Sequence, residues 1–204
     1  MATASNTDQR TWAGTTLADR RAARRRQLLA AGLELLGTEG STAVSVRAVC
    51  RTAKLTERYF YENFADRDAL LLAVYERVAA QAKDALIEAV RKAPGRPETV
   101  RAAVTAFVEL ILDDPRKGSV LLLAPLTDPS LTRRGAELQP AFAAVIHDQL
   151  PGEIDEPERK MMATALVGAL TNLFITYLNG TLQVPRHRLV EHCVRMLLSA
   201  ATAG

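Results

Sequence analysis

The sequence predicts an all-α protein of about nine helices, with an N-terminal three-helix helix-turn-helix domain joined by a long helix to a C-terminal helical bundle. Hydrophobic residues make up 48% of the chain and aromatic residues only 5%, and abundant Ala, Leu, Arg and Glu favour helix. Apolar residues recur with helical spacing in one segment after another, and Gly-Pro breaks are few and well separated. A chain of 204 residues is long enough for one or two domains with substantial cores.

The first segment of the chain, residues 1–18, is predicted to form a mobile tail, because this polar stretch around Trp12 lacks helical periodicity. A cluster of arginines follows: Arg20, Arg21, Arg24, Arg25 and Arg26. Such a cluster is usually a solvated helix face, but beside a groove-reading unit it can also contact phosphates or enter the minor groove. The pattern leaves both readings open. The first helix then presents one apolar stripe and ends at residues 38–40, and the stripe comprises Leu28, Ala31, Gly32, Leu35 and Leu36.

Two short helical segments follow in residues 45–67 and meet at residues 54–55. Val46, Val49 and Cys50 share one face of the first, and Ser45 is suited to cap its start. Thr56 can cap the second. Its apolar positions point inward and its other side chains outward; the inward positions are Phe60 and Phe64, the outward ones Glu57, Arg58, Tyr59 and Tyr61. This arrangement indicates a helix-turn-helix, whose second helix enters the major groove of DNA.

Arg58 is the residue best suited to read a base edge, because its planar fork matches the two acceptors of a guanine. Hydroxyl and basic side chains nearby can contact phosphates without reading sequence. The candidate DNA-binding residues are therefore Ser45, Arg47, Thr56, Glu57, Arg58, Tyr59, Tyr61 and Arg67. The alternative is a plain three-helix packing unit with incidental surface charge.

Residues 28–72 resemble the DNA-binding region of the TetR family of bacterial transcriptional repressors. The positions that carry the resemblance in its first two helices are Leu28, Ala31, Leu35, Leu36, Gly40, Ser45, Val46, Arg47 and Val49. Those that follow are Thr56, Tyr61, Phe64, Arg67 and Leu70, which fall on the family's hydroxyl cap, phosphate-contacting tyrosine, core aromatic, basic fourth-helix start and core leucine. The chain departs from the family at Lys54 and Arg58, where glycine is common, and at Asn63, where histidine is common. These departures bear on the operator sequence more than on the fold.

A long helix is predicted from Asp66, which can cap it, to about Lys92, with Asp68 favouring the positive end of its dipole. Such a helix connects the DNA-binding unit to the rest of the chain as a lever. The next helix is expected at residues 98–112, and a short apolar run at 120–123 ends before Pro125. Residues 128–150 form another helix, which Pro140 should kink or divide. Such a kink is a common place for a cavity, and a merely tolerated proline is an equally good interpretation.

The two last helices are predicted at residues 156–178 and 185–201. The first of them is apolar over a wide arc, which indicates burial on two sides. In the TetR family the corresponding helices pair with those of a second subunit as a four-helix bundle, and small residues such as Gly168 permit close approach. The expected dimer-interface residues are Leu166, Leu170, Leu173, Tyr177, Val190, Val194 and Leu197.

Polar residues are set among the apolar positions of the C-terminal helices: Thr105, His147, Thr171, Asn172, Thr176 and Tyr177. Each alone fits a core position with an internal partner. Together with nearby phenylalanines they predict an apolar pocket with a few orienting groups. Its candidate residues are Tyr75, Phe107, Ile111, Leu122, Phe142, His147, Thr171, Asn172 and Phe174. Because few lysines or arginines fall inside the apolar stripes, the expected ligand is neutral or weakly polar and hydrophobic.

Charge is uneven along the chain: residues 1–65 hold 10 Lys and Arg against 6 Asp and Glu, and the remainder hold 16 against 17. The basic share therefore lies on the predicted DNA surface. Cys50 and Cys193 are expected to be small buried hydrophobes rather than redox sensors, since a sensor needs an accessible thiolate of low pKa. The N-terminus has no signal-peptide core, and no apolar run approaches the ~18 residues of a membrane span, so a cytoplasmic location is expected.

No HExxH, CxxC, GxSxG, P-loop or dinucleotide-binding motif occurs, and the three histidines lack metal-ligand spacing. We therefore expect no enzyme activity, no cofactor and no metal. The sequence predicts a homodimeric transcriptional repressor, with residues 19–65 as its DNA-binding domain and residues 66–204 as its ligand-binding and dimerisation domain. Its partners would be a palindromic operator in double-stranded DNA and a small hydrophobic effector. The alternative is a helical ligand carrier or enzyme in which the helix-turn-helix is only a packing motif.

Overall fold

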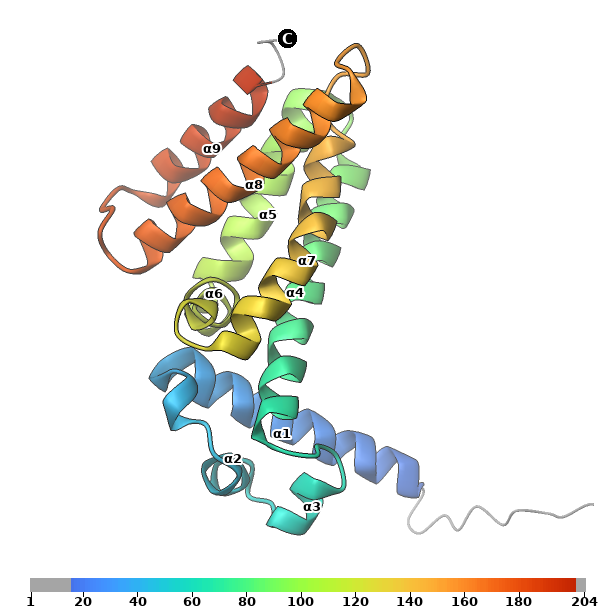
Figure 1. The fold of residues 1–204 in the computed structure, drawn as a ribbon, viewed down its shortest axis with the longest axis vertical. Coiled ribbons are helices and arrows are strands. Elements are labelled where there is room, and N and C mark those ends of the chain that lie inside the picture. Colours follow the sequence, from blue (N-terminus) through green and yellow to red (C-terminus); the bar gives the residue numbers. More distant parts are fainter. Residues whose placement is uncertain (1–15, 201–204) are drawn as a thin grey trace, which may run out of the picture.

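The computed structural model describes residues 16–200, and the regular elements in this part of the chain are all helical (Figure 1). Its nine α-helices are α1 (Leu17–Glu39), α2 (Val46–Ala53), α3 (Glu57–Tyr61), α4 (Arg67–Lys92), α5 (Arg96–Leu112), α6 (Pro115–Gly118), α7 (Pro129–His147), α8 (Glu156–Leu178) and α9 (Arg186–Ala200). A π turn (Ser119–Leu123) and a 3-10 turn (Ala124–Leu126) connect α6 to α7. The predicted all-α class and helix count are confirmed.

The first helix begins at Leu17, two residues before the predicted boundary. Its start is fixed by a capping box in which the Thr16 hydroxyl accepts from the Asp19 amide at 3.1 Å. The Asp19 carboxylate in turn accepts from the Thr16 amide at 3.0 Å. This reciprocal pair satisfies two backbone donors that the first turn would otherwise leave free. The rest of the predicted mobile tail, residues 1–15, lies outside the described residues.

Helix α4 connects the two halves of the molecule (Figure 1). The Asp66 carboxylate accepts from the Ala69 amide at 2.8 Å, which confirms the predicted cap. The inner face of α4 is buried from Leu70 to Ala82, and these residues belong to one continuous hydrophobic cluster that extends from α1 to α9. A displacement of α4 is therefore transmitted to both halves through close packing rather than through a flexible linker.

Helix α7 passes through Pro140 without being divided, so that part of the expectation for Pro140 was wrong. Proline supplies no amide hydrogen for the carbonyl of residue 136, one turn earlier. Pro140 and Ala136 are both exposed, so water can satisfy that carbonyl. The proline is tolerated because it lies on the outer side of the helix.

Helix α8 is apolar but little covered by its own chain. Only Ala163, Leu166 and Phe174 are buried, and Met161 has 59% of its surface exposed. By length and composition alone, α8 is apolar enough to cross a membrane, which corrects the expectation that no segment approaches that length. One such helix is weak evidence for a membrane protein, because helices of soluble cores pass the same test.

Candidate functional site

The turn between α2 and α3 is built around Lys54, whose backbone is left-handed with φ 54° and ψ 41°. Its amide donates to the Arg51 carbonyl at 3.2 Å, and the Leu55 amide donates to the Cys50 carbonyl at 2.9 Å. This residue is the one non-glycine with positive φ among the described residues. The left-handed conformation explains why glycine suits this position, since a side chain there costs about 1 kcal/mol or more.

The outer surface of α2 and α3 presents most of the predicted DNA-binding side chains to solvent. Arg47 and Arg58 have 91% and 85% of their side chains exposed, and Tyr61 has 57% of its surface exposed. Ser45 is exposed and caps α2, with its hydroxyl accepting from the Ala48 amide at 3.2 Å. Thr56 is exposed at the N-cap position of α3, but its hydroxyl makes no capping bond and is free to contact a phosphate.

Two acidic residues hold the exposed arginines loosely. Arg47 Nε lies 3.6 Å from Glu57 Oε1, and Arg58 Nε lies 3.2 Å from Glu62 Oε1. Exposed pairs of this kind contribute at most about 1 kcal/mol, so a phosphate or a base edge can replace the carboxylate. Glu57 is itself exposed on the outer face of α3.

Tyr59 does not face outward as predicted, because residues of α1 cover it. It is half-buried, and the Arg24 guanidinium lies 4.3 Å from its ring centroid. Arg21 Nη2 donates to the Glu62 carbonyl at 2.6 Å, and Arg25 Nη1 donates to the Asn63 carbonyl at 3.1 Å. Three of the five clustered arginines thus support the C-terminal end of α3, where a positive charge also complements the helix dipole. Neither sequence-based reading of the cluster anticipated this role.

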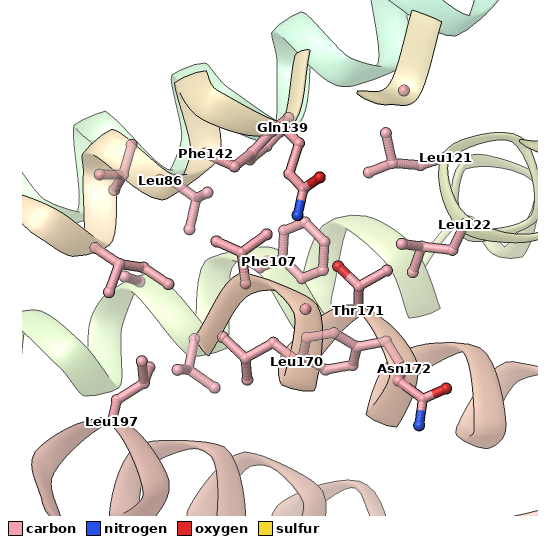
Figure 2. A pocket seen from close by; sticks show the side chains of 18 of the residues that line it. Leu86, Phe107, Leu121, Leu122, Gln139, Phe142, Leu170, Thr171, Asn172 and Leu197 are labelled. Carbon is pink, nitrogen blue, oxygen red and sulfur yellow. The ribbon is translucent and has the colours of Figure 1, made fainter. Parts of the chain in front are cut away.

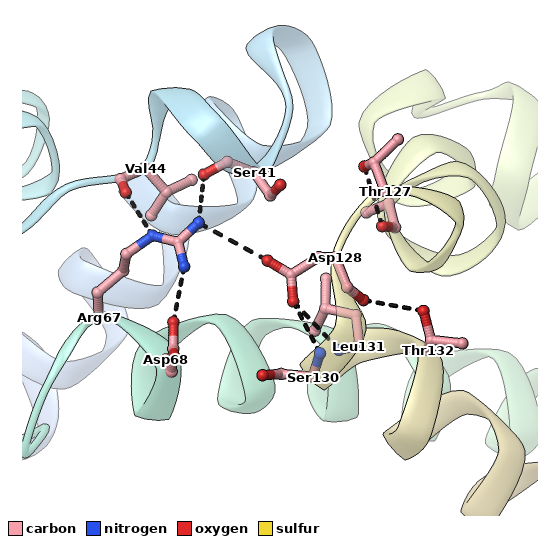
Figure 3. Close-up of polar contacts among 10 residues, drawn as sticks. Ser41, Val44, Arg67, Asp68, Thr127, Asp128, Ser130, Leu131 and Thr132 are labelled. Atoms are coloured by element: carbon pink, nitrogen blue, oxygen red, sulfur yellow. Dashed lines mark hydrogen bonds and ion pairs between the residues drawn. The ribbon is translucent and has the colours of Figure 1, made fainter.

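Arg67 occupies a different place from the predicted phosphate contact, since its guanidinium points inward (Figure 3). Its Nε donates to the Val44 carbonyl at 2.8 Å, and its Nη2 donates to the Ser41 carbonyl at 2.5 Å. The same Nη2 lies 3.7 Å from the Asp128 carboxylate, and Nη1 pairs with Asp68 at 2.6 Å. With its donors engaged by the protein, Arg67 joins the turn before α2 to the start of α7.

A cavity of about 570 Å³ lies among α4, α5, α7 and α8 (Figure 2). Seven of the nine predicted pocket residues line it: Tyr75, Phe107, Leu122, Phe142, Thr171, Asn172 and Phe174. The rings of Phe107 and Phe174 are in contact, with centroids 5.1 Å apart. The size and the largely apolar lining match those of small-molecule sites.

Two predicted pocket residues do not line the cavity. Ile111 lies one turn beyond Phe107 on the same face of α5, where it is fully buried in the hydrophobic core past the end of the cavity lining. His147 is turned toward acidic groups, with Nδ1 3.3 Å from Asp148 Oδ1 and Nε2 3.2 Å from Glu156 Oε2. Sequence periodicity assigns residues to a helix face but gives no information on which carboxylate the next helix supplies.

The polar lining of the cavity is sparse. Figure 2 shows Gln139 from α7 and Thr171 from α8 extending into the same space beside Phe107. Neither side chain, nor that of Asn172, has a hydrogen bond to another residue in the described part of the chain. Tyr75 is 5% exposed, and burial raises the pKa of its phenol, so it is a neutral donor at physiological pH. Gln139 and Arg96 line the cavity and were missed from the sequence, because neither lies in an apolar stripe.

The N-terminal segment matches a known family. Residues 28–74 match the family model described as bacterial regulatory proteins, tetR family. This segment therefore has the N-terminal domain of the TetR family. The match covers the end of α1, all of α2 and α3, and the first third of α4.

Solved structures show that the similarity of fold extends beyond this domain. The fatty acid degradation regulator FadR from Bacillus halodurans has a TM-score of 0.74 at 14% identity, covering 86% of this chain and 94% of that one. A putative transcriptional regulator from Pseudomonas aeruginosa PAO1 has a TM-score of 0.74 at 20% identity, covering 89% and 92%. FadR from Bacillus subtilis, in complex with stearoyl-CoA, has a TM-score of 0.70 at 14% identity, covering 86% and 98%. The comparison with curated proteins gives no match.

The predicted dimer residues on α8 and α9 divide into two groups. Leu166 and Val194 are buried within the chain, and Leu170 and Leu197 line the cavity, so these four already have contacts of their own. The others are half-buried: Leu173, Tyr177 and Val190. The exposed side of α8 instead carries residues at helical spacing, namely Met161, Ala165, Gly168 and Ala169. Of these four, Gly168 also borders the cavity. The two-sided apolar pattern is thus shared between the cavity and the uncovered surface.

The cysteines and the acidic residues offer no additional chemistry in the described part of the chain. Cys50 and Cys193 are free and buried. Burial raises the pKa of both thiols, that of Cys193 to about 11. No group of three or more His, Cys, Asp and Glu side chains among the described residues can hold a metal ion.

Proposed function

We propose that this TetR-family protein is a homodimeric transcriptional repressor that binds a palindromic operator and releases it when a small molecule with a large apolar part occupies the cavity. The observation that carries the proposal is the position of α4. This helix follows α3 directly and lines the cavity with Tyr75, Leu86 and Val90. Residues 19–65 form the DNA-binding domain in this proposal, and residues 66–204 the ligand-binding and dimerisation domain.

The DNA-binding part of the proposal is supported by the exposed side chains of α2 and α3. Arg58 is the candidate base reader, because its guanidinium is exposed and is paired only with the half-buried carboxylate of Glu62. Arg47, Thr56 and Tyr61 are exposed on the same surface and are the candidate phosphate contacts. Arg67 has no direct DNA contact in this proposal, and it supports the turn before α2 instead.

The ligand part is supported by the cavity and by what related folds bind. FadR from Bacillus subtilis was solved with stearoyl-CoA, and the multidrug binding protein EbrR was solved with imidazole. Both contain the same fold at 20% identity or less, so the identity of a ligand does not carry over to this chain. The ligand part rests instead on an apolar space of about 570 Å³ bounded by three phenylalanines, Phe107, Phe142 and Phe174.

The dimer part is supported by the uncovered apolar side of α8. Ala165, Gly168 and Ala169 are small and exposed, and a Cβ added at Gly168 would meet no atom within 4 Å. A second copy of this surface can therefore approach closely. Dimerisation places two recognition helices about 34–36 Å apart, one turn of DNA, or further apart if the half-sites are more widely separated.

The test is a titration of the purified protein against genomic DNA fragments, with footprinting at low and at physiological salt. We expect a protected, palindromic site near a promoter, and a reporter gene behind that promoter should be repressed. Protection at neither salt concentration would reject the regulator and favour the alternative, a helical ligand carrier or enzyme. As a regulator, the protein would act in the cytoplasm, on the nucleoid. A mass-spectrometric survey of copurifying compounds would then identify effectors to assay for operator release.

A further inference from the structure

One charged side chain stands among the described residues that line the cavity, that of Arg96. It is the first residue of α5, where the helix dipole adds positive potential. Arg96 is partly buried, and its guanidinium has no hydrogen bond or ion pair with any other residue that the structure describes. An arginine keeps its charge at any physiological pH, so this wall of an otherwise apolar cavity is permanently cationic.

The cavity is elongated along α4. Its lining on this helix extends from Tyr75 to Val90, which at 1.5 Å per residue is about 22 Å. On α7 the lining extends over a similar length, from Thr132 to Ile146, and it continues to Leu150 just after the helix. Arg96 comes shortly after the C-terminal end of α4, where Val90 lies. It therefore lies at the end of the cavity that is far from Tyr75 and from the DNA-binding domain. Between these ends the walls are mainly aliphatic and phenylalanine side chains (Figure 2).

The opposite end has no comparable free charge. Arg134 lies near Tyr75, but its guanidinium is paired with Glu76 at 2.8 Å and with Glu137 at 2.7 Å. Tyr75 itself offers only a neutral hydroxyl. A negative group on a ligand would therefore be compensated at Arg96 and not at Tyr75, because burying an unpaired charge is costly.

We propose that the ligand is an elongated amphiphile, with an apolar chain that lies along α4 and an acidic group that pairs with Arg96. The inference rests on the proposed ligand site and names its chemical class. This inference replaces the expectation of a neutral ligand. That expectation was based on the apolar stripes of the helices, and Arg96 lies outside these stripes. The acidic group can be the carboxylate of a free acid or the phosphates of a carrier to which the acid is joined as a thioester. Arginine binds both kinds of anion well.

The experiment measures binding by isothermal titration calorimetry with hexadecanoate, 1-hexadecanol, octanoate and hexadecanoyl-CoA. We expect hexadecanoate to bind about ten- to a hundredfold more tightly than hexadecanol, the ratio for a hydrogen bond to a charged group. Octanoate should bind more weakly than hexadecanoate, because it covers less of the apolar wall. A preference for the thioester over the free acid would identify phosphate as the anion, and the reverse would identify the carboxylate.

Two variants on α5 separate the role of Arg96 from a general effect of charge. Arg96→Gln should lower the affinity for hexadecanoate to that for hexadecanol and leave hexadecanol binding unchanged. Arg101→Gln is the matched control, since Arg101 is exposed on the same helix and does not line the cavity. Equal binding of acid and alcohol to the native protein, or an acid preference that survives Arg96→Gln, would overturn the inference. Unchanged hexadecanol binding also verifies that the variant is folded.

The outcome is distinguishable from failure of the proposed function. If hexadecanoate binds through Arg96 but no operator is found or released, the ligand class stands and the repressor proposal fails. If a compact neutral compound releases the operator while no amphiphilic acid binds, the repressor proposal stands and this inference fails.

Discussion

The carboxylate of Asp128 lies 3.7 Å from the guanidinium of Arg67 and thereby connects the cavity to the DNA-binding domain (Figure 3). Its other oxygen caps α7 by accepting from the amides of Ser130 at 3.1 Å and Leu131 at 3.3 Å. Thr132, which lines the cavity, donates to the Asp128 carbonyl at 3.0 Å. A ligand that shifts the start of α7 therefore shifts Asp128 relative to Arg67, which holds the turn before α2.

The first prediction concerns Asp128→Asn. The amide oxygen can still cap α7, but the charge that attracts Arg67 is lost. Because Arg67 is one-third exposed, we expect a stability loss below about 1 kcal/mol. The effect of an identified ligand on operator affinity should fall several-fold, while affinity for the ligand itself changes little. Operator titrations with and without ligand measure this coupling.

Asp68→Asn provides the control, because Asp68 pairs with the same guanidinium but lies on α4 beside it. It should leave the coupling intact. A coupling reduced equally by both substitutions would show that Arg67 acts only within the DNA-binding domain.

The second prediction concerns the turn of the helix-turn-helix. Lys54→Gly removes a Cβ from a left-handed residue, which relieves about 1–2 kcal/mol of strain, and it costs about 0.5–1 kcal/mol in backbone entropy. We expect a net stabilisation of about 0.5–1 kcal/mol, measured by urea unfolding. Lys54→Ala keeps the strain and should bring no gain. A less stable glycine variant would mean that the lysine side chain makes a stabilising contact of its own.

The sequence predicted the helices well, because helix formation depends on neighbouring residues. The cap at Asp66 and the buried position of Phe60 follow from local spacing. The inward contacts of Arg67 could not be predicted, because its partners at positions 41, 44 and 128 lie up to 61 residues away in the chain. The same basic residue can serve a phosphate or a carboxylate, and only the fold decides which is near.

The sequence predicted only some of the residues that line the cavity, and the reason is related. Its aromatic residues lie on the apolar stripes of α5, α7 and α8, and the stripes can be read from sequence. Arg96 lies at a helix end, where a sequence pattern cannot distinguish a solvated charge from one beside a cavity. Tyr59 was placed outward because nothing in its own helix shows that Arg24 from α1 covers it.

The third prediction concerns base recognition. Arg58→Ala should weaken operator binding by about 1–3 kcal/mol and relax the preference at one base position, because a bidentate contact to guanine is lost. Tyr61→Phe should weaken operator and unrelated DNA alike, since phosphates carry no sequence information. Fluorescence anisotropy with both DNAs at one fixed salt concentration measures the two effects. If Arg58→Ala weakened binding to the operator and to unrelated DNA equally, Arg58 would not be a base-reading residue.

The fourth prediction concerns the two thiols. Burial raises the pKa of Cys193 to about 11 and also that of Cys50, so both are protonated below pH 8. Only the thiolate reacts with disulfide reagents. We expect no reaction of the native protein with 5,5′-dithiobis(2-nitrobenzoate) at pH 7.5, and reaction of both thiols after unfolding in urea. Rapid modification of the native protein would revive the redox-sensor interpretation.

The fifth prediction tests the dimer through Ala169, which is exposed in the single chain on the apolar side of α8. Ala169→Glu places a carboxylate where the proposed interface excludes water, at a cost of several kcal/mol per subunit for burying the charge. The dimer should dissociate at micromolar concentration in sedimentation, and operator affinity should fall because a monomer contacts one half-site. Ala80→Glu is the matched control, an exposed alanine on α4, and it should leave the dimer intact. A variant that remains dimeric with native operator affinity would place the interface on another surface.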